Sequence, residues 1–265
     1  MDLELTGKQA LVTGGSRGIG KAVARALAAE GCDVAVVARG REMLEASAAE
    51  IASATGRRVV AIVADTGSRE SIQAMVASAG EALGGVNILV NCAARPAGQA
   101  PAPKLDAVTD ELFWEDMNVK VLGYLRCAQT VAPLMVANGW GRIINISGLA
   151  ARMATSAVGS MRNVAVAALT KNLADELGPR GVNVTVVHPG LTRTEATPGV
   201  VSRLCAARGI SEEEAERSLA ANSIRHLVDA DEVASVVAFL ASPRSRAING
   251  DAVICGGGQP GPIFY

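Results

Sequence analysis

Short, almost continuous apolar runs alternate with longer helical segments along the whole chain of 265 residues. Seven runs predict β-strands, near residues 8–12, 33–38, 59–64, 86–91, 142–146, 182–187 and 252–254. Continuous apolar strands are typical of a sheet that is buried on both faces. Helical patterns lie between them, near 19–30, 41–54, 69–83, 110–137, 160–177 and 230–241. This alternation predicts a doubly wound α/β fold, with seven parallel strands flanked by helices.

The chain shows no internal repeat, low-complexity tract or interdomain linker. One domain over residues 1–265 is therefore expected, although length alone also permits two smaller ones. A segment at about 191–228 interrupts the alternation, and we interpret it as a lid over a substrate pocket. Within it, Ser211 and Glu214 have the spacing of a capping box that opens a helix. Its apolar residues favour a small, partly apolar substrate: Leu191, Val200, Val201, Leu204, Leu219 and Ile224.

A glycine-rich turn, Thr13-Gly14-Gly15-Ser16-Arg17-Gly18-Ile19-Gly20, joins the first strand to the first helix. Its glycines allow a sharp turn and a close approach of the backbone to a pyrophosphate, and the helix N-terminus favours that charge. A glycine string alone is a weak signal, but the strand–turn–helix context makes it specific. The turn predicts a Rossmann-type domain that binds a dinucleotide at residues 14–20.

The end of the second strand indicates which dinucleotide is preferred. A site for NAD usually has an acidic residue there, which bonds the ribose hydroxyl. This chain instead reads Val37-Ala38-Arg39, and Arg17 lies within the glycine turn. Two guanidinium groups near the adenosine ribose favour a 2′-phosphate. We therefore predict NADP(H) as the preferred cofactor, with NAD(H) possible.

The amino-acid composition indicates which binding partners and which cellular compartment to expect. Asp plus Glu number 26 and Lys plus Arg number 25, a balance that gives no sign of a nucleic-acid partner. No apolar run approaches the ~20 residues of a membrane span, and the acidic start lacks the regions of a signal peptide. Five scattered cysteines, none in a C-x-x-C pair, favour free thiols and no metal site. We expect a soluble, cytoplasmic protein.

Further motifs follow the glycine turn, and together they are specific. They are Asp65 after the third strand, Asn91-Cys92-Ala93-Ala94, Met117-Asn118-Val119, Ile144-Asn145-Ile146-Ser147, and Pro189-Gly190 with Thr192 and Thr194. With the turn, they resemble the classical short-chain dehydrogenase/reductase (SDR) family over nearly the whole chain. The resemblance implies an NAD(P)-dependent oxidoreductase, commonly a tetramer.

The resemblance also implies roles for single residues. Asp65 and Thr66 would contact adenine, and Asn91, in the same motif as Ala93, would lie near the adenine ribose. Pro189 and Gly190 would face the nicotinamide. Thr194, two residues after Thr192, would lie beside the amide of the nicotinamide or beside the phosphates. Ser147 would orient the substrate carbonyl, although some relatives place that serine at the position of Gly148. Asn118 would hold a water in a proton relay.

One family signature is missing, the catalytic pair Tyr-x-x-x-Lys. In the family, a leucine follows the lysine by six residues and the tyrosine by ten. Counting back from Leu169 places Asn163 at the lysine position and Gly159 at the tyrosine position. Glycine has no proton to give, and a neutral asparagine cannot favour a phenolate. Asn163 keeps only the ability to hydrogen-bond the nicotinamide ribose.

Three other residues are candidate proton donors. Ser160 has a hydroxyl that is hard to ionise without a base beside it, and it also suits a helix N-terminus. His188 precedes Pro189-Gly190 and could transfer protons near neutral pH. Tyr265 ends a glycine-rich tail that could reach a neighbouring subunit, although such termini are usually flexible.

Three functions remain open on these residues. The first is an NADP(H)-dependent oxidoreductase with an atypical proton donor, acting on a small, partly apolar carbonyl or alcohol. The second is a dinucleotide-binding protein without turnover, or a partner subunit. The third is a non-redox enzyme that performs elimination or hydration on the same fold. The helix near Val164–Ala168 is apolar all round, so we expect a homo-oligomer, a dimer or tetramer.

Overall fold

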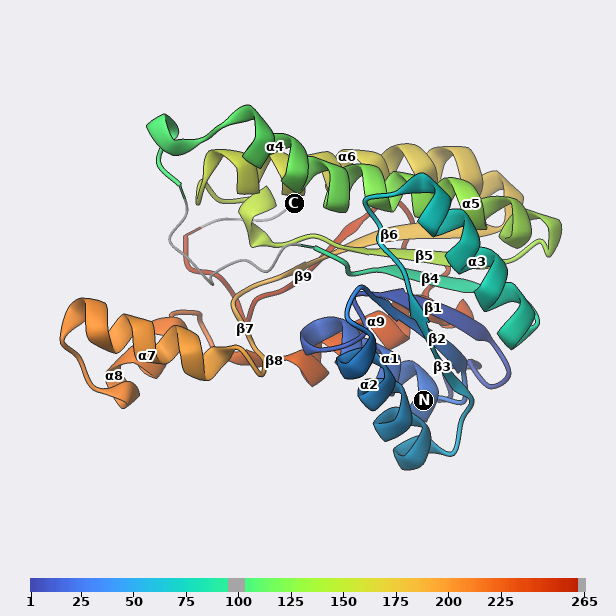
Figure 1. Ribbon diagram of the computed structural model, residues 1–265, viewed down its shortest axis with the longest axis horizontal. Helices are drawn as coiled ribbons and strands as arrows, with labels where there is room; N and C mark the ends of the chain where they lie inside the picture. The colour runs from blue at the N-terminus through green and yellow to red at the C-terminus, as the bar shows by residue number, and fades with distance from the viewer. Residues whose placement is uncertain (95–102, 262–265) are drawn as a thin grey trace.

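The computed structural model describes residues 1–94 and 103–261. Its main sheet has seven strands in the order β3-β2-β1-β4-β5-β6-β9, and every pair is parallel (Figure 1). This confirms the predicted fold class. The strands are β1 (Gln9–Thr13), β2 (Asp33–Ala38), β3 (Val59–Val63), β4 (Ile88–Asn91), β5 (Gly141–Ile146), β6 (Val182–Pro189) and β9 (Ala252–Cys255).

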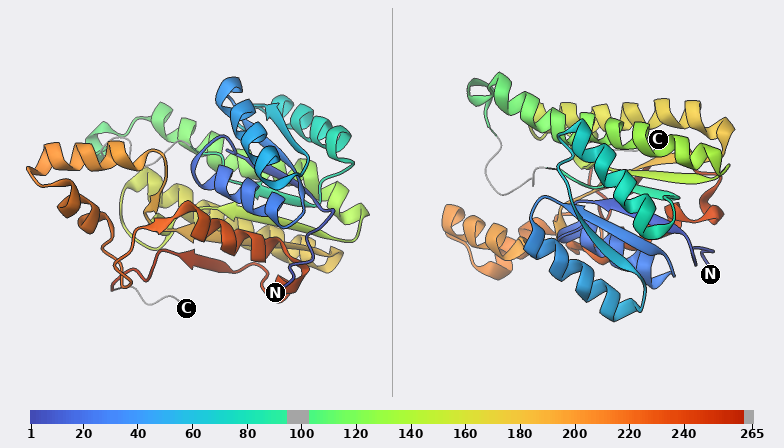
Figure 2. Two further views of the ribbon diagram at one scale, coloured as in Figure 1. Left: turned by 90° about the horizontal axis from the view of Figure 1, so that it is seen from below. Right: turned by 45° about the vertical axis from the view of Figure 1, so that its right-hand side comes forward.

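Helices cover both faces of this sheet (Figures 1 and 2). One layer holds α1 (Gly18–Ala29), α2 (Arg41–Thr55) and α9 (Ala230–Ala241), and the other holds α3 (Arg69–Leu83), α5 (Gly123–Ala137) and α6 (Ala157–Leu177). Neighbouring strand residues alternate between the cores on the two faces of the sheet. Val12 packs in the core with α1, α2 and α9, whereas Leu11 packs in the core with α3, α5 and α6. Because both faces are buried, the strands read as continuous apolar runs.

The strand order indicates at which edge of the sheet a ligand is expected to bind. β1 pairs with β2 on one side and with β4 on the other, so the chain winds outward in opposite directions from this point. In open parallel sheets, ligands bind in the crevice at such a switch point, outside the carboxyl ends of the strands. The glycine turn follows β1 at this edge, and Cys92, Ala93 and Ala94 follow β4 there.

The predicted helix 110–137 is not continuous. It is divided into α4 (Asp110–Met117), a π-helical turn at Asn118–Leu122, and α5. A π-helical turn accommodates an extra residue, so the side chains around it are rotated relative to a regular helix. Sequence periodicity cannot show such a local change, and it alters which residue of this stretch faces the sheet edge.

The segment at 191–228 forms two helices and a small sheet of its own. It contains β7 (Thr192–Arg193), α7 (Thr197–Arg208) and α8 (Glu212–Leu219), and β7 pairs in parallel with β8 (Val228–Asp229). Figure 1 shows α7 and α8 projecting beside the main sheet. The capping box before α8 is confirmed, because Ser211 and Glu214 exchange both hydrogen bonds. α7 was not predicted, since only Thr197 and Val201 of it are buried and it has no apolar stripe.

Four short 3₁₀ turns complete the described elements, at Leu105–Ala107, Leu149–Ala151, Gly178–Arg180 and Pro243–Ser245. α6 begins earlier than its sequence pattern indicates, because the Ser156 hydroxyl accepts a hydrogen bond from the Gly159 backbone N–H and caps the helix. Within residues 1–94 and 103–261, no helix has both the length and the apolar character needed to cross a bilayer.

Substitution of Leu11 tests how much packing of the central strand β1 contributes to the free energy of unfolding. Its side chain is fully buried, so Leu11→Ala should lower the free energy of unfolding by about 2–5 kcal/mol through lost burial and a residual cavity. Leu105→Ala is the matched control, since Leu105 is 87% exposed and its loss should change stability by less than about 0.5 kcal/mol. Urea unfolding followed by circular dichroism measures both, and equal unfolding midpoints for the two variants would contradict this packing.

Candidate active site

A cleft of about 930 Å³ lies along the carboxyl edge of the sheet, a volume within the range of ligand sites. Its walls come from the glycine turn, the ends of β2 to β6, the start of α6 and the segment after β6. All but one of the residues predicted to hold a dinucleotide line it: Gly14, Ser16, Arg17, Gly18, Ile19, Gly20, Arg39, Asp65, Thr66, Ala93, Pro189, Gly190, Thr192 and Thr194.

The glycine turn is held close to its neighbours by backbone contacts. Gly15 donates its N–H to the Val37 carbonyl oxygen at 3.0 Å. A Cβ on Gly20 would overlap the carbonyl oxygen of Gly14, and one on Gly14 would lie 3.0 Å from the backbone nitrogen of Ala93. Gly14 also has φ +72°, a left-handed conformation that favours glycine. Side chains at these positions would force the strand and the helix apart.

The start of α1 already binds an anion. The Gly18 backbone N–H donates to the Glu195 carboxylate at 2.9 Å, which is the kind of partner that the free N–H groups of a helix N-terminus attract. A phosphate presents the same charge and acceptor atoms as this carboxylate. The turn therefore fits the pyrophosphate of a dinucleotide.

The charges near the end of β2 are positive. Arg17 and Arg39 are exposed and line the cleft, and no ion pair joins either of them to another residue of the described ranges. The neighbouring Arg41, by contrast, is bound to Glu45 at 3.0 Å and lies off the cleft wall. Two guanidinium groups without carboxylate partners suit a phosphate ester.

Asn91 is the predicted cofactor residue that does not line the cleft. Its side chain is fully buried within the sheet and donates to the Asn145 amide oxygen at 2.9 Å. Asn145 in turn donates to the Thr170 hydroxyl at 2.9 Å. Side chains alternate between the faces of a strand, and the motif sequence does not show on which face Asn91 lies. The Asn91 side chain thus lies inside the sheet and not on the cleft wall.

A buried polar cluster forms the floor of the cleft where β5 meets α6. Ser147 and Asn163 are 8% and 4% exposed. The Ser147 hydroxyl lies 3.0 Å from the Asn163 carbonyl oxygen and 3.2 Å from its side-chain oxygen. Gly148 adjoins them, and a Cβ there would meet the Asn163 amide at 3.4 Å. The structure therefore brings the two predicted residues together.

The sequence did not predict that Lys120 belongs to this cluster. Its ammonium nitrogen donates to the Ser147 carbonyl oxygen at 2.9 Å and to the Asn163 side-chain oxygen at 3.0 Å. Lys120 lies in the π-helical turn, is only 4% exposed and lines the cleft. Its signal in the sequence is a lysine within the apolar run Val119-Lys120-Val121-Leu122, because a buried lysine is rare unless it is paired.

The surroundings make this lysine a weak base. Burial, reinforced by the positive charge of Arg162, lowers the pKa of Lys120 from 10.5 to about 7, since low-dielectric surroundings disfavour the charged form. Cys92 and Asp116 oppose this shift. Arg162 itself is paired with Asp116 at 2.6 Å. Lys120 therefore exchanges its proton near neutral pH.

Asn118 lies outside this cluster and does not line the cleft. Its amide nitrogen donates to the Gly67 carbonyl oxygen at 3.1 Å, and its oxygen accepts from the Arg126 guanidinium at 2.7 Å. These bonds tie the π-helical turn to the loop before α3. The residue of this turn that lines the cleft and contacts Ser147 is Lys120, not Asn118.

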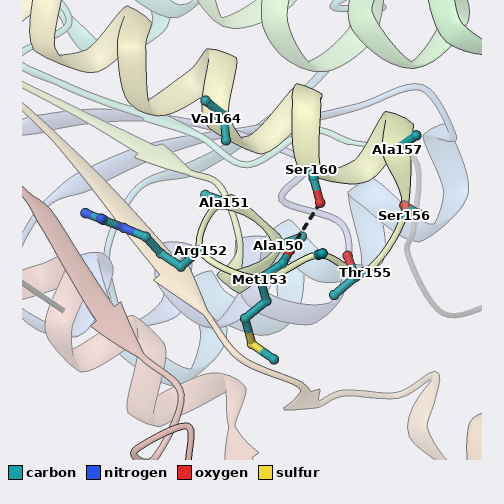
Figure 3. Close-up of a pocket in the computed structure, with 10 residues that line it drawn as sticks. Ala150, Ala151, Arg152, Met153, Thr155, Ser156, Ala157, Ser160 and Val164 are labelled. Atoms are coloured by element: carbon teal, nitrogen blue, oxygen red, sulfur yellow. Dashed lines mark hydrogen bonds between the residues drawn. The ribbon is translucent and has the colours of Figure 1, made fainter. Parts of the chain in front are cut away.

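Of the remaining candidates, Gly159 and Ser160 line pockets and His188 lines neither. Gly159 lines the main cleft. Ser160 lines a smaller adjoining pocket, and its hydroxyl donates to the Met153 carbonyl oxygen at 3.1 Å (Figure 3). His188 is fully buried, off the cleft wall, and desolvation lowers its pKa to about 4, so it is neutral at pH 7. Tyr265 lies outside the described residues.

Comparisons with known proteins point to one family. Residues 14–259 match the family described as enoyl-(acyl carrier protein) reductase. The short-chain reductase NovJ of Streptomyces niveus is 36% identical over 252 residues, which cover 95% of this chain and 93% of that protein. The 3-oxoacyl-[acyl-carrier-protein] reductase FabG of Vibrio cholerae is 33% identical over 97% of this chain and 99% of that protein.

This chain belongs to the short-chain dehydrogenase/reductase family. Solved SDR structures are closely similar. L-sorbose reductase from Gluconobacter frateurii, complexed with NADPH and L-sorbose, matches with a TM-score of 0.93 and 28% identity over 99% of this chain and 100% of the other. A short-chain dehydrogenase from Burkholderia cenocepacia in complex with NADP matches with a TM-score of 0.82 and 37% identity over 96% and 98%.

The lowered pKa of Lys120 predicts a pH-dependent stability. Between pH 7 and 10.5 the unfolded chain binds the proton that folded Lys120 has lost, so stability rises with pH in this window. Lys120→Met removes this contribution. The unfolding free energy of wild type relative to Lys120→Met should therefore rise by about 2 kcal/mol from pH 7 to pH 9. Urea titrations at both pH values measure it, and a constant difference would show that the folded-state pKa is unshifted.

Proposed function

We propose that this SDR is an NADP(H)-dependent oxidoreductase that reduces a small, partly apolar carbonyl compound, or oxidises the corresponding alcohol, with an atypical proton donor. One observation carries the proposal. A single continuous cleft joins the glycine turn, Arg17 and Arg39 to the polar cluster of Ser147, Asn163 and Lys120. A cofactor held at one end and a carbonyl held at the other would share that cleft.

The residues at the turn would hold the cofactor. The backbone of residues 14–20 would bind the pyrophosphate, and Arg17 and Arg39 would bind the 2′-phosphate. Pro189, Gly190 and Thr194 would lie along the nicotinamide half. When bound, NADPH supplies a hydride to the substrate carbon. The NADPH and NADP complexes of the two structural relatives support this choice of cofactor.

The proton has to come from a source other than the usual tyrosine. We propose that Gly159 and Asn163 stand at the family's tyrosine and lysine positions, on the spacing to Leu169. Ser147 would orient the carbonyl, although its hydroxyl already bonds Asn163. General acid–base catalysis typically raises the reaction rate by 10²–10⁴-fold. An SDR without the tyrosine therefore needs another acid for efficient turnover.

The segment at 191–228 would act as the lid and set substrate size. Leu191, Val200, Leu219 and Leu227 line the cleft from this segment, with Thr192, Thr194 and Glu195 among them. Such a mixed wall suits a small molecule with one apolar side.

An oligomer is part of the proposal. Met161 and Val164 are about half exposed on α6, at 48% and 50%. Apolar side chains on one helix face are typical of subunit interfaces, which accords with the expected homo-oligomer. The free cysteines accord with the cytoplasm as the proposed compartment.

A binding and turnover assay tests the function. NADPH should bind in a fluorescence titration, and a panel of small ketones, diketones and sugars should then oxidise it, measured as a loss of absorbance. Binding without oxidation by any compound would contradict the oxidoreductase and favour a dinucleotide-binding protein without turnover. Product formation without NADPH consumption would favour a non-redox enzyme.

Arg39 tests cofactor choice. Arg39→Asp should weaken NADPH binding by about tenfold or more, because a charge-assisted hydrogen bond to a phosphate contributes about 1.5–3 kcal/mol. NADH binding should change by less than about threefold, since NADH has no 2′-phosphate. Arg41→Ala is the control, because Arg41 lies off the cleft wall and is bound to Glu45. Equal losses for NADPH and NADH would contradict a 2′-phosphate contact.

A further inference from the structure

Lys120 has a hydrogen-bond arrangement that suits proton transfer. An ammonium group has three N–H donors, whereas the neutral amine has two donors and one lone pair. Two donors are used by fixed acceptors, the Ser147 carbonyl oxygen at 2.9 Å and the Asn163 side-chain oxygen at 3.0 Å. The third position is therefore the one that changes between a proton and a lone pair, and Lys120 is one of the residues that line the cleft.

We propose that Lys120 is the acid that protonates the substrate carbonyl oxygen; this role rests on the proposed reductase function. The Nζ–H bond breaks and an O–H bond forms on the substrate, while the hydride that NADPH supplies reduces the carbonyl carbon. Lys120 becomes a neutral amine and regains a proton from water. In the oxidation direction the amine takes the hydroxyl proton.

The other ionisable groups of this end of the cleft do not suit the role. Burial raises the pKa of the Cys92 thiol to about 11, so it is a poor acid at neutral pH. The Arg162 guanidinium is held by both carboxylate oxygens of Asp116, at 2.6 and 2.8 Å. His188 is neutral and off the cleft wall. Lys120 alone among these four combines a transferable proton with a place in the cleft.

The charges that face Lys120 set its pH range. Burial favours loss of the proton, Arg162 on α6 reinforces this, and the Asp116 carboxylate on α4 favours its retention; the Cys92 thiol after β4 is uncharged near pH 7. His188 on β6 adds no charge at pH 7 because its pKa is lowered to about 4. The pKa of about 7 for Lys120 keeps the acid partly protonated at neutral pH, as efficient general acid catalysis requires.

Trace acetylation tests the position and titration of Lys120 without any variant. Wild-type protein is treated with limiting isotopic acetic anhydride over a pH series, and peptides are quantified by mass spectrometry. Labelling of Lys120 should be half-maximal near pH 7. Lys171, whose side chain is 60% exposed, is the internal control for the amount of reagent that reaches the protein. No labelling of Lys120, or a midpoint near 10, would overturn the proposal.

Kinetics test the chemical role. With a carbonyl that oxidises NADPH, Lys120→Met should lower the reduction rate by about 10²–10⁴-fold, and the NADPH dissociation constant should stay within about threefold. The wild-type rate should fall above pH 7 as the acid loses its proton, and the variant should lose this dependence. Lys171→Met should behave as wild type.

The outcomes separate the two proposals. A Lys120→Met protein that keeps its rate and pH profile would overturn the donor role and leave the reductase function standing. Labelling of Lys120 near pH 7 in a protein that oxidises no NADPH would refute the reductase function, and the donor role with it, while the position of the amine is upheld.

Discussion

The pairing of β4 beside β1 is the constraint on which the functional half of this SDR depends. It reverses the direction in which the chain winds, so the glycine turn after β1 and the loop after β4 meet at one edge of the sheet. The contact has no room for side chains, because a Cβ on Gly14 would lie 3.0 Å from the Ala93 nitrogen. The cleft that continues from this edge also includes Ser147 and Asn163 among its lining residues.

Burying a lysine there costs desolvation free energy, and the fold offsets it in two ways. Two fixed acceptors take two of the three N–H donors of the ammonium, and loss of a proton near neutral pH removes the buried charge. Asn163 on α6 and Lys120 on the π-helical turn form this cluster together with Ser147. The positive charge at the cleft is thus supplied by Lys120 of the π-helical turn and not by a residue of α6. The proposed acid is therefore compatible with a neutral Asn163 on α6.

Much of the fold could be predicted, because strands buried on both faces have a continuous apolar signature. The strand 33–38 and the helices 69–83 and 230–241 agree with the structure at both ends. The break at Asn118–Leu122 could not be predicted, since a π-helical turn leaves the surrounding apolar pattern intact. α7 could not be predicted either, because a helix with few buried residues shows no apolar stripe.

The sequence by itself determined the turn, its glycines and the positive charges of Arg17 and Arg39, because these depend on residues next to one another in the chain. Its spacing also predicts Gly159 and Asn163 at the positions of the family's tyrosine and lysine. Only the tertiary structure decided that the cleft lining includes neither Asn91 nor Asn118, and that Lys120 hydrogen-bonds Asn163. Side-chain direction at a strand end or in a π-helical turn is fixed by packing between elements distant in sequence, and no local pattern records it.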